Sequence, residues 1–540
     1  MDSSREHWGS KLGVVLAVAG SAVGLGNFLR FPVQAATNGG GTFIIPYIIA
    51  FIVLGIPLSW IEWTLGRYAG ILGHGTSPGA YDKIIRKPWG KYLGSIGLLP
   101  PLFIIFYYVF IESWILAFTW YSFNGRLMEV VQAGKITEFF GNFISLNEKI
   151  GALPAAIVFF AITFVCNMAL ISLGVRKGIE RVNKISMPIL VIMGIALVIR
   201  VLTLPGISHG LAFMWNPDFS ALTNPQMWLA AAGQVFFTMS LGMGIIFCYA
   251  SYTKRNEDLV LSSLSAGSAN AFAEIILGGT IVIPLAIIVI GANIEECAKL
   301  GTFGLAFQSM PLVFGKIPFG SAFMSLWFLM LFIAGVTSAI SIIQPLISFC
   351  EDDLKFTRKG AVATIGTISF IGGIIAIAGL SAGAVDELDF WGGSFLLVLL
   401  GTIQAIVFAM VLGRKKSANV PNESEAFALL SEGSAIKLPK IFRIIIQYVC
   451  PVALVVLLVS WSIHDGMDIL LLRHIADDAM VQFFGISISQ KAFIQGFRLF
   501  LLVTILLVNF AIWYAWKSGR ATGRSPKIKK VQIGISEEDA

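Results

Sequence analysis

The sequence predicts an all-α integral membrane protein of about twelve transmembrane helices, in which the first and sixth helices are broken at the midplane. Composition indicates the membrane, because 56% of the 540 residues are hydrophobic and 13% are charged, shares above and below those of ordinary soluble domains. Apolar runs of about 20 residues, enough to cross a hydrocarbon core of roughly 30 Å, recur along the chain. Glycine-rich segments at residues 20–27 and 238–244 interrupt two of these runs.

The expected spans follow one another without a long soluble domain between them. They lie near residues 11–36, 42–66, 93–123, 152–175, 179–206, 227–252, 259–292, 319–349, 360–380, 390–413, 441–463 and 493–516. We expect a first five-helix repeat over residues 1–206 and a second, inverted repeat over 207–416. Residues 417–540 add the last two spans and a tail.

Basic residues concentrate in alternate loops, and this pattern sets the orientation. With a cytoplasmic amino terminus, the clusters at residues 83–91, 176–181, 414–416 and 527–530 all fall on the cytoplasmic side. The pattern favours a multi-pass protein of the cell (inner) membrane with both termini in the cytoplasm. The net charge of +7 is thereby explained without a nucleic-acid partner, which would require a basic face.

Several functional classes receive no support from the sequence. The amino-terminal residues lack a small-residue cleavage site, so we expect no removable signal peptide. The five cysteines show no metal-binding spacing, and Cys297 alone falls in a predicted outer loop, so we expect no disulfide framework. No nucleophile has a plausible base, which argues against an enzyme.

The two interruptions would release main-chain donors and acceptors inside the membrane. Lipid cannot satisfy these groups, so irregular backbone is tolerated only where it is buried in protein or lines a polar cavity. Close packing of small residues is an alternative explanation for either glycine segment alone. The two breaks occupy matching places in two five-span halves, which favours an inverted repeat with a binding site between the halves.

The released groups suit an amino acid and a hard cation. Amide ends of broken helices can bind a carboxylate, and carbonyl ends can bind an ammonium group. Sodium takes oxygen ligands, which the free carbonyls could provide together with the side chains of Asn27, Thr238, Asn270, Thr337 and Ser338. Any one of these side chains is explained as well by hydrogen bonding within the helices, so the prediction rests on the set.

Seven motifs closely resemble those of the neurotransmitter:sodium symporter family, and the similarity covers nearly the whole chain. They are REHW (5–8), GSAVGLGNFLRFP (20–32), NGGG (38–41), YY (107–108), FFTMSLG (236–242), AGVTS (334–338) and DELDFW (386–391). The resemblance implies a LeuT-type 5+5 inverted repeat. It also implies sodium-coupled symport of small hydrophobic amino acids by alternating access.

The resemblance implies two sodium sites. The first would be formed by Ala22, Asn27, Thr238 and Asn270 and completed by the substrate carboxylate. The second would bridge the first and eighth spans and consist of Gly20, Val23, Ala334, Thr337 and Ser338.

The resemblance also implies the substrate contacts. The carboxylate would meet the backbone of Leu25 and Gly26 and the hydroxyl of Tyr108, and the ammonium group would meet Ala22, Phe237, Thr238 and Ser240. The substrate side chain would rest on Ile104, Tyr108, Phe237, Met243, Ser338 and Ile342. Without the family, Phe237 and Ile342 would be interpreted as core packing. Met243 and Ile104 replace a phenylalanine and a valine of the leucine-transporting member, so Leu, Met, Val, Ile, Ala and aromatic amino acids all stay candidate substrates.

Two charged pairs are expected to close the pathway. Arg30 and Asp389 would form the outer gate, although a snorkelling arginine is an alternative explanation for Arg30. Arg5 and Asp352 would form the cytoplasmic gate, beside Trp8 and other aromatic and polar side chains.

Intramembrane carboxylates are the remaining candidates. Glu274 follows Asn270 by one helical turn, so both project from one face of the seventh span. It could supply the negative charge that bound chloride provides in chloride-dependent relatives, and we therefore expect no chloride requirement. The alternative is a carboxylate that only supports the fold. Glu62 and Glu112 are expected to cap free amides at the sixth-span break.

Two other functions use the same fold. A proton-driven or exchange carrier would bind substrate without sodium, and a sensor would bind the amino acid without efficient transport. Membrane lipid is an expected partner, and the protein would be a monomer or a homodimer.

Overall fold

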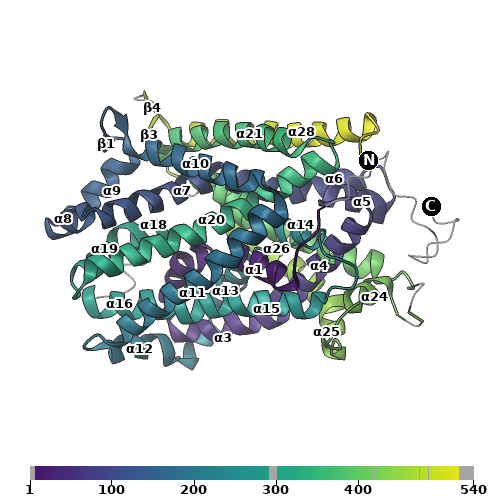
Figure 1. Cartoon of the computed structure of the whole chain (residues 1–540), viewed down its shortest axis with the longest axis horizontal. Coiled ribbons are helices and arrows are strands. Elements are labelled where there is room, and N and C mark those ends of the chain that lie inside the picture. The colour runs from purple at the N-terminus through teal and green to yellow at the C-terminus, as the bar shows by residue number, and fades with distance from the viewer. Residues whose placement is uncertain are drawn as a thin grey trace.

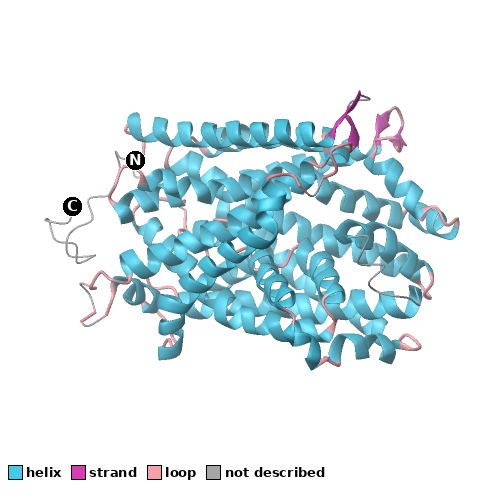
Figure 2. Cartoon of the chain, turned by 180° about the vertical axis from the view of Figure 1, so that it is seen from behind, coloured by secondary structure: helices cyan, strands magenta, loops and turns pink. Residues whose placement is uncertain are grey.

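The computed structural model describes residues 6–290, 301–417, 420, 421, 423–473, 475–483 and 486–521. Arg5, Cys297 and the basic tail at 527–530 lie outside these residues. Long helices packed side by side form most of the molecule (Figure 1). Seen from behind, the described chain is almost entirely helical, with short strands at one end (Figure 2).

Ten helical stretches of the described chain are long and apolar enough to cross a membrane. Their helices are α3 (Gly41–Ala50) with α4 (Ile56–Ile71), α6 (Gly90–Gly94) with α7 (Leu99–Phe123), α10 (Ala155–Ser172), α11 (Arg181–Leu202), α15 (Leu259–Ala271) with α16 (Thr280–Ile290), α20 (Gly320–Asp352), α21 (Arg358–Ala378), α22 (Ala384–Leu388) with α23 (Leu396–Ile406), α25 (Lys440–Ile444) with α26 (Cys450–Trp461), and α28 (Gln490–Lys517). The protein is therefore a multi-pass membrane protein.

Shorter elements connect the spans. They are α5 (Ser77–Ile85), α8 (Arg126–Gln132), α9 (Ile136–Ile144), α12 (Ile207–Trp215), α18 (Gly301–Gly304), α19 (Met310–Gly315), α24 (Glu425–Ser431) and α27 (Met467–Leu470), with the antiparallel strand pairs β1 (Lys149–Ile150) and β2 (Leu153–Pro154), and β3 (Met480–Phe483) and β4 (Ile486–Ser489).

The first expected span is bent at its glycine segment. Helix α1 (Lys11–Ala22) is followed by a π-helical turn, Gly26–Arg30, and by α2 (Phe31–Thr37), and the direction changes by 46°. At the bend the backbone amide of Gly24 donates to Ala22 at 2.9 Å, instead of to the residue four positions back. The predicted interruption is confirmed.

The sixth expected span has a longer interruption. Helices α13 (Pro225–Thr238) and α14 (Ile245–Ala250) are each too short to cross a membrane alone. Between them Gly242 and Gly244 have φ values of +69° and +72°, which favour glycine. A Cβ on Gly242 would overlap the carbonyl oxygen of Leu397 in α23. The left-handed backbone and this close approach explain why glycine stands at the break.

The two ends of the bundle carry different elements. Helices α5, α6, α24 and α25 gather at one end, whereas α8, α9, α12 and the strands lie at the opposite end (Figure 1). The basic cluster at residues 83–91 belongs to the α5 and α6 end. The cluster at 414–416 is tied to α24, because the amide of Glu425 donates to the carbonyl of Lys415 at 2.8 Å. Both clusters thus lie at one end, as the expected orientation requires.

Candidate functional site

Three buried polar side chains from different spans meet where the two broken helices approach each other. The side-chain amide of Asn27 donates to Asn270 Oδ1 at 2.8 Å and to Thr238 Oγ1 at 3.2 Å. The amide of Asn270 donates to the same threonine hydroxyl at 3.1 Å, and Asn27 Oδ1 accepts the backbone N–H of Gly24 at 2.9 Å. The structure therefore brings together the side chains expected at the first sodium site, and Ala22 ends α1 two residues before Gly24.

A second group of oxygens joins the first break to α20, the eighth span. The backbone carbonyl of Ser21 accepts the hydroxyls of Ser240 and Ser338, each at 3.2 Å. Thr337 donates within its own helix, to the carbonyl of Ala334 at 3.0 Å. The hydroxyl of Thr337 therefore hydrogen-bonds within its own helix, as is common for threonine in membrane helices. The hydroxyl of Ser338 instead hydrogen-bonds to the first span.

The main chain of the first break lies close to α20. A Cβ on Gly24 would stand 2.5 Å from Ser338 Oγ, so a larger residue there would force a shift. Because Gly24 donates to Ala22, the carbonyl of Gly20 lacks its usual helical donor. The amide of Asn27 donates to Gly24 at 3.3 Å, which leaves the carbonyl of Val23 without its usual donor as well. The backbone oxygens of Gly20 and Val23, two residues expected at the second sodium site, are therefore free of regular helical bonding.

The residues expected around the substrate side chain lie on three helices and in the second break. Ile104 and Tyr108 are on α7, Phe237 is on α13, Met243 is in the second break, and Ser338 and Ile342 are on α20; Phe237 is half-buried and the others are buried. The ring of Phe237 lies against the first break, because a Cβ on Gly26 would stand 2.9 Å from it.

Tyr108 carries an unusual hydroxyl. This oxygen is buried and makes no hydrogen bond of standard geometry among the described residues, and it lies near the backbone of Leu25 and the side chain of Ser338. A Cβ on Gly24 would stand 3.6 Å from it, so the hydroxyl lies beside the first break. A buried polar group that lacks a well-formed hydrogen bond is costly, and such a group beside a break in the main chain suits a polar ligand.

On the side of these residues that is expected to face outward, the two expected gate partners are separate. The guanidinium carbon of Arg30 lies 4.3 Å from the centre of the Phe237 ring. Asp389 Oδ1 accepts the hydroxyl of Tyr107 at 2.6 Å. Among the ion pairs of the described chain there is no Arg30–Asp389 contact. The direct pair expected for a closed outer gate is therefore absent in this conformation, because each partner is held by an aromatic side chain.

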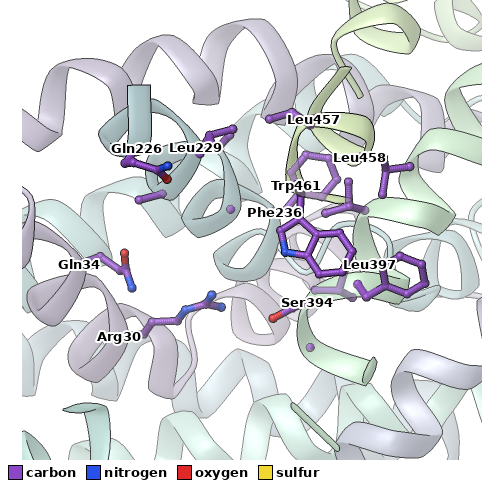
Figure 3. A pocket seen from close by; sticks show the side chains of 16 residues that line it. Arg30, Gln34, Gln226, Leu229, Phe236, Ser394, Leu397, Leu457, Leu458 and Trp461 are labelled. Carbon is purple, nitrogen blue, oxygen red and sulfur yellow. The ribbon is translucent and has the colours of Figure 1, made fainter. Parts of the chain in front are cut away.

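A cavity of about 330 Å³ opens beside Arg30. Arg30 and Gln34 lie on one side of it, and Leu458 and Trp461 lie on the other (Figure 3). The guanidinium group of Arg30 points into this space (Figure 3). The Arg30 side of the site is therefore hollow.

The opposite side is filled by direct contacts. Trp8 is 2% exposed, and its Nε1 donates to the carbonyl of Tyr249 at 2.8 Å. The side-chain amide of Gln344 donates to the Tyr252 hydroxyl at 2.9 Å, and that hydroxyl donates to Ser348 at 3.1 Å. The expected cytoplasmic gate is thus packed shut around these side chains.

Asp352 belongs to the same network. Ser348 Oγ donates to Asp352 Oδ2 at 3.0 Å. Its expected partner, Arg5, lies outside the described residues, so that pair stays a prediction.

The intramembrane carboxylates differ in their partners. Glu62 Oε1 accepts the backbone N–H of Gly242 at 2.7 Å, which confirms that it caps the second break. The same expectation for Glu112 is wrong, because Glu112 Oε2 instead accepts the side-chain amide of Asn167 at 2.9 Å. Glu112 projects toward α10 from the long helix α7, and sequence position alone did not reveal which neighbour it faces.

Glu274 is fully buried and receives two donors, the hydroxyl of Tyr47 and the side-chain amide of Gln234. Neither donor was predicted from the sequence. One signal was present: Gln234 is a polar residue in an apolar span and stands one helical turn before Thr238. The place of Tyr47 opposite Glu274 had no such local signal.

The site combines two helix breaks that face each other, a set of buried oxygens between them, and two ends that differ in how tightly they are packed. Together these features are typical of a membrane carrier. The chain belongs to the sodium:neurotransmitter symporter family, whose sequence model matches residues 5–132 and 128–494.

Individual comparisons agree. An uncharacterized sodium-dependent transporter of Haemophilus influenzae is 32% identical over 484 residues, which cover 85% of this chain and 98% of that one. A similarly described transporter of Methanocaldococcus jannaschii is 33% identical over 423 residues, or 76% and 83% of the two chains. The crystal structure of MhsT in complex with L-phenylalanine superimposes with a TM-score of 0.72 at 31% identity and covers 85% of this chain and 100% of that one. The protein is therefore a transporter of this fold and not an enzyme.

Proposed function

We propose that the protein is a sodium-coupled symporter of small hydrophobic amino acids that works by alternating access. The observation that carries this proposal is the buried network of Asn27, Thr238 and Asn270 at the junction of the two breaks. The network offers oxygens from three spans at a place where backbone carbonyls are also free. The amino acid bound to MhsT and the sodium dependence in the names of the relatives support the same conclusion.

Two sodium ions would travel as cargo with the substrate. The first would bind Ala22, Asn27, Thr238 and Asn270, and the second would bind Gly20, Val23, Ala334, Thr337 and Ser338. All of these residues would provide neutral oxygen ligands, which suit a hard monovalent cation. The substrate carboxylate would complete the first shell, so the substrate would bind tightly only when sodium is present.

The same geometry suits a zwitterion. The carboxylate would accept from the amides of Leu25 and Gly26 and from the hydroxyl of Tyr108, which otherwise makes no hydrogen bond of standard geometry in the described chain. The ammonium group would bind the carbonyls of Ala22, Phe237 and Thr238 with Ser240, and the side chain would rest on Ile104, Tyr108, Phe237, Met243, Ser338 and Ile342. Met243 is flexible, so this wall can adjust to larger side chains.

Transport would proceed by closing one end and opening the other. Arg30 would leave the ring of Phe237 and approach Asp389 once substrate is bound, and the network around Trp8 and Asp352 would then separate. The repeats at residues 1–206 and 207–416 would supply the two moving parts.

Sodium can supply enough energy. With a potential of about 100 mV, worth ~2.3 kcal/mol per charge, and a tenfold gradient, worth ~1.4 kcal/mol, two ions provide ~7.4 kcal/mol. Under tight coupling this free energy limits accumulation of a neutral amino acid to about five decades.

We also propose that transport needs no chloride. Both carboxylate oxygens of Glu274 accept hydrogen bonds, and the residue stands one turn from Asn270. An ionised carboxylate there would replace a bound anion, and it would also permit proton counter-movement. Sodium-driven uptake should persist when chloride is replaced by gluconate, and its collapse would exclude this role for Glu274.

The experiment that tests the function uses the purified protein in sealed proteoliposomes. Binding and uptake of radiolabelled Leu, Met and Phe are measured with an inward sodium gradient and with choline in place of sodium. Sodium-dependent accumulation supports the proposal. Binding without accumulation would instead show a sensor, and accumulation driven by a proton gradient or by counter-substrate in choline would show a different carrier.

A further inference from the structure

One polar side chain of the fifth span is oriented toward the first break without any assigned role. Asn183 lies on α11 and is fully buried. Its side-chain amide donates to the carbonyl of Ile179 at 2.9 Å, which orients the group. With the NH₂ end held in this way, the carbonyl end points out from α11. That oxygen, Oδ1, has no hydrogen-bond partner among the described residues.

The position of this oxygen is defined by Gly20. A Cβ built on Gly20 would overlap Asn183 Oδ1, so the amide oxygen fills the space that any larger residue would take. Helix α11 packs against both α1 and α20, the two spans that the second sodium site would bridge. The oxygen therefore stands where three spans meet.

The surroundings offer this oxygen few donors. The amides next to the break are already used, because Gly24 donates to Ala22 and to Asn27 Oδ1, and Val23 donates to Ala19 at 2.6 Å. Gly20 has no side chain that could donate. A buried carbonyl oxygen requires a partner, and beside a backbone carbonyl that is also free the fitting partner is a cation.

We infer that Asn183 supplies an additional oxygen ligand to the second sodium site, an inference that rests on the proposed function. The ion would then be held by α1, α11 and α20 together, and not by α1 and α20 alone. An amide oxygen has the same hard, neutral character as the carbonyls and hydroxyls of that site. Sodium bound there would link the fifth span to the first span through shared coordination. Release of sodium would remove this link.

The test compares the sodium dependence of substrate binding in single variants of the full-length protein. Asn183→Ala removes the oxygen and should raise the sodium concentration for half-maximal binding about tenfold, the effect of losing one good polar contact. Asn183→Asp keeps a side-chain oxygen near that place although it loses the donation to Ile179, so its sodium midpoint should stay below that of Asn183→Ala. Asn509→Ala is the matched control, because Asn509 also donates to the carbonyl four residues back, Ile505, but lies on α28.

A second readout separates binding from packing. Sodium without substrate should raise the melting temperature of wild type, and this rise should shrink in Asn183→Ala, because a ligand stabilises the folded state in proportion to its affinity. An unchanged sodium midpoint in Asn183→Ala, or equal melting shifts in sodium and choline, would overturn the inference. The same measurement distinguishes a failure of this inference from a failure of the proposed function. If the proposed function is wrong, the wild-type protein itself would bind substrate equally well in choline and in sodium.

Discussion

The two ends of the central site are closed in different ways. At the end expected to face the cytoplasm, Trp8 is buried against Tyr249, and direct hydrogen bonds link Tyr252, Gln344 and Ser348. At the other end Arg30 lies over the half-buried ring of Phe237, and a cavity of about 330 Å³ begins beside it. One end is thus closed by several packed layers and the other by a single aromatic ring and its cation.

This difference indicates which contacts must break at each end before a small molecule can pass. The cavity side needs only a small movement of one arginine and one ring to admit a small molecule. The Trp8 side must break several hydrogen bonds and expose buried aromatic surface before anything leaves. Under the proposed mechanism, this conformation corresponds to the stage at which a carrier receives cargo at its Arg30 end.

The largest expected effect comes from opening the packed end. Trp8→Ala removes a large buried side chain, at a cost of about 3–5 kcal/mol in contacts that hold this end closed. The thiol of Cys248, which is buried on α14 next to Tyr249, should then react with a charged alkylating reagent at least about tenfold faster. The rate is measured in a variant whose other four cysteines are replaced.

A matched control is available at the same end. Trp89 is 55% exposed, so Trp89→Ala should leave the alkylation rate of Cys248 unchanged. Equal rates in Trp8→Ala and in its parent would show that the packing around Trp8 does not close the pathway.

The next effect concerns the centre, between the two ends. Tyr108→Phe should weaken amino-acid binding by about ten- to a hundredfold, because a hydroxyl that bonds to a carboxylate contributes about 1.5–3 kcal/mol. Stability without substrate should change little, since that hydroxyl makes no hydrogen bond of standard geometry in the described chain. Equilibrium binding and thermal unfolding measure the two quantities.

Tyr121 provides the control for this prediction. It lies on the same helix, α7, and its hydroxyl is also buried without a partner among the described residues. Tyr121→Phe should leave substrate affinity unchanged. If both variants bind as wild type does, the hydroxyl of Tyr108 does not contact the substrate.

The smallest effect is expected at the cavity end. Arg30→Ala removes the cation that lies over the Phe237 ring in this conformation and that is proposed to approach Asp389 once substrate is bound. A partly exposed ion pair contributes about 0.2–1 kcal/mol, so substrate should dissociate up to about fivefold faster, with folding intact. Arg126→Ala is the control, because Arg126 also stacks on aromatic rings but lies in the α8 region. An unchanged dissociation rate in Arg30→Ala would show that Arg30 is no part of the closure.

Much of this architecture was predictable because it depends on local properties of the chain. Apolar run length predicted the spans, and glycine segments predicted both breaks, since helix propensity and span length act over a few residues. Gly242 is an example, because its left-handed backbone admits few other residues. The capping role of Glu62 also followed from an isolated carboxylate in an apolar span.

Other features depended on how helices rotate and pack, which no local pattern encodes. Glu112 bonds to Asn167 and not to the second break, and Tyr47 donates to Glu274 from a distant span. The orientation of Asn183 toward Gly20 is of the same kind.

By itself, the sequence determined that the protein crosses the membrane many times, that two of its helices are broken, and which motifs place it in a transporter family. Tertiary structure alone decided which buried oxygens share a site, that Arg30 contacts Phe237 instead of Asp389, and which end is open. The reason is physical: backbone breaks arise from neighbouring residues, whereas the direction in which a side chain points is decided by the helices packed against it.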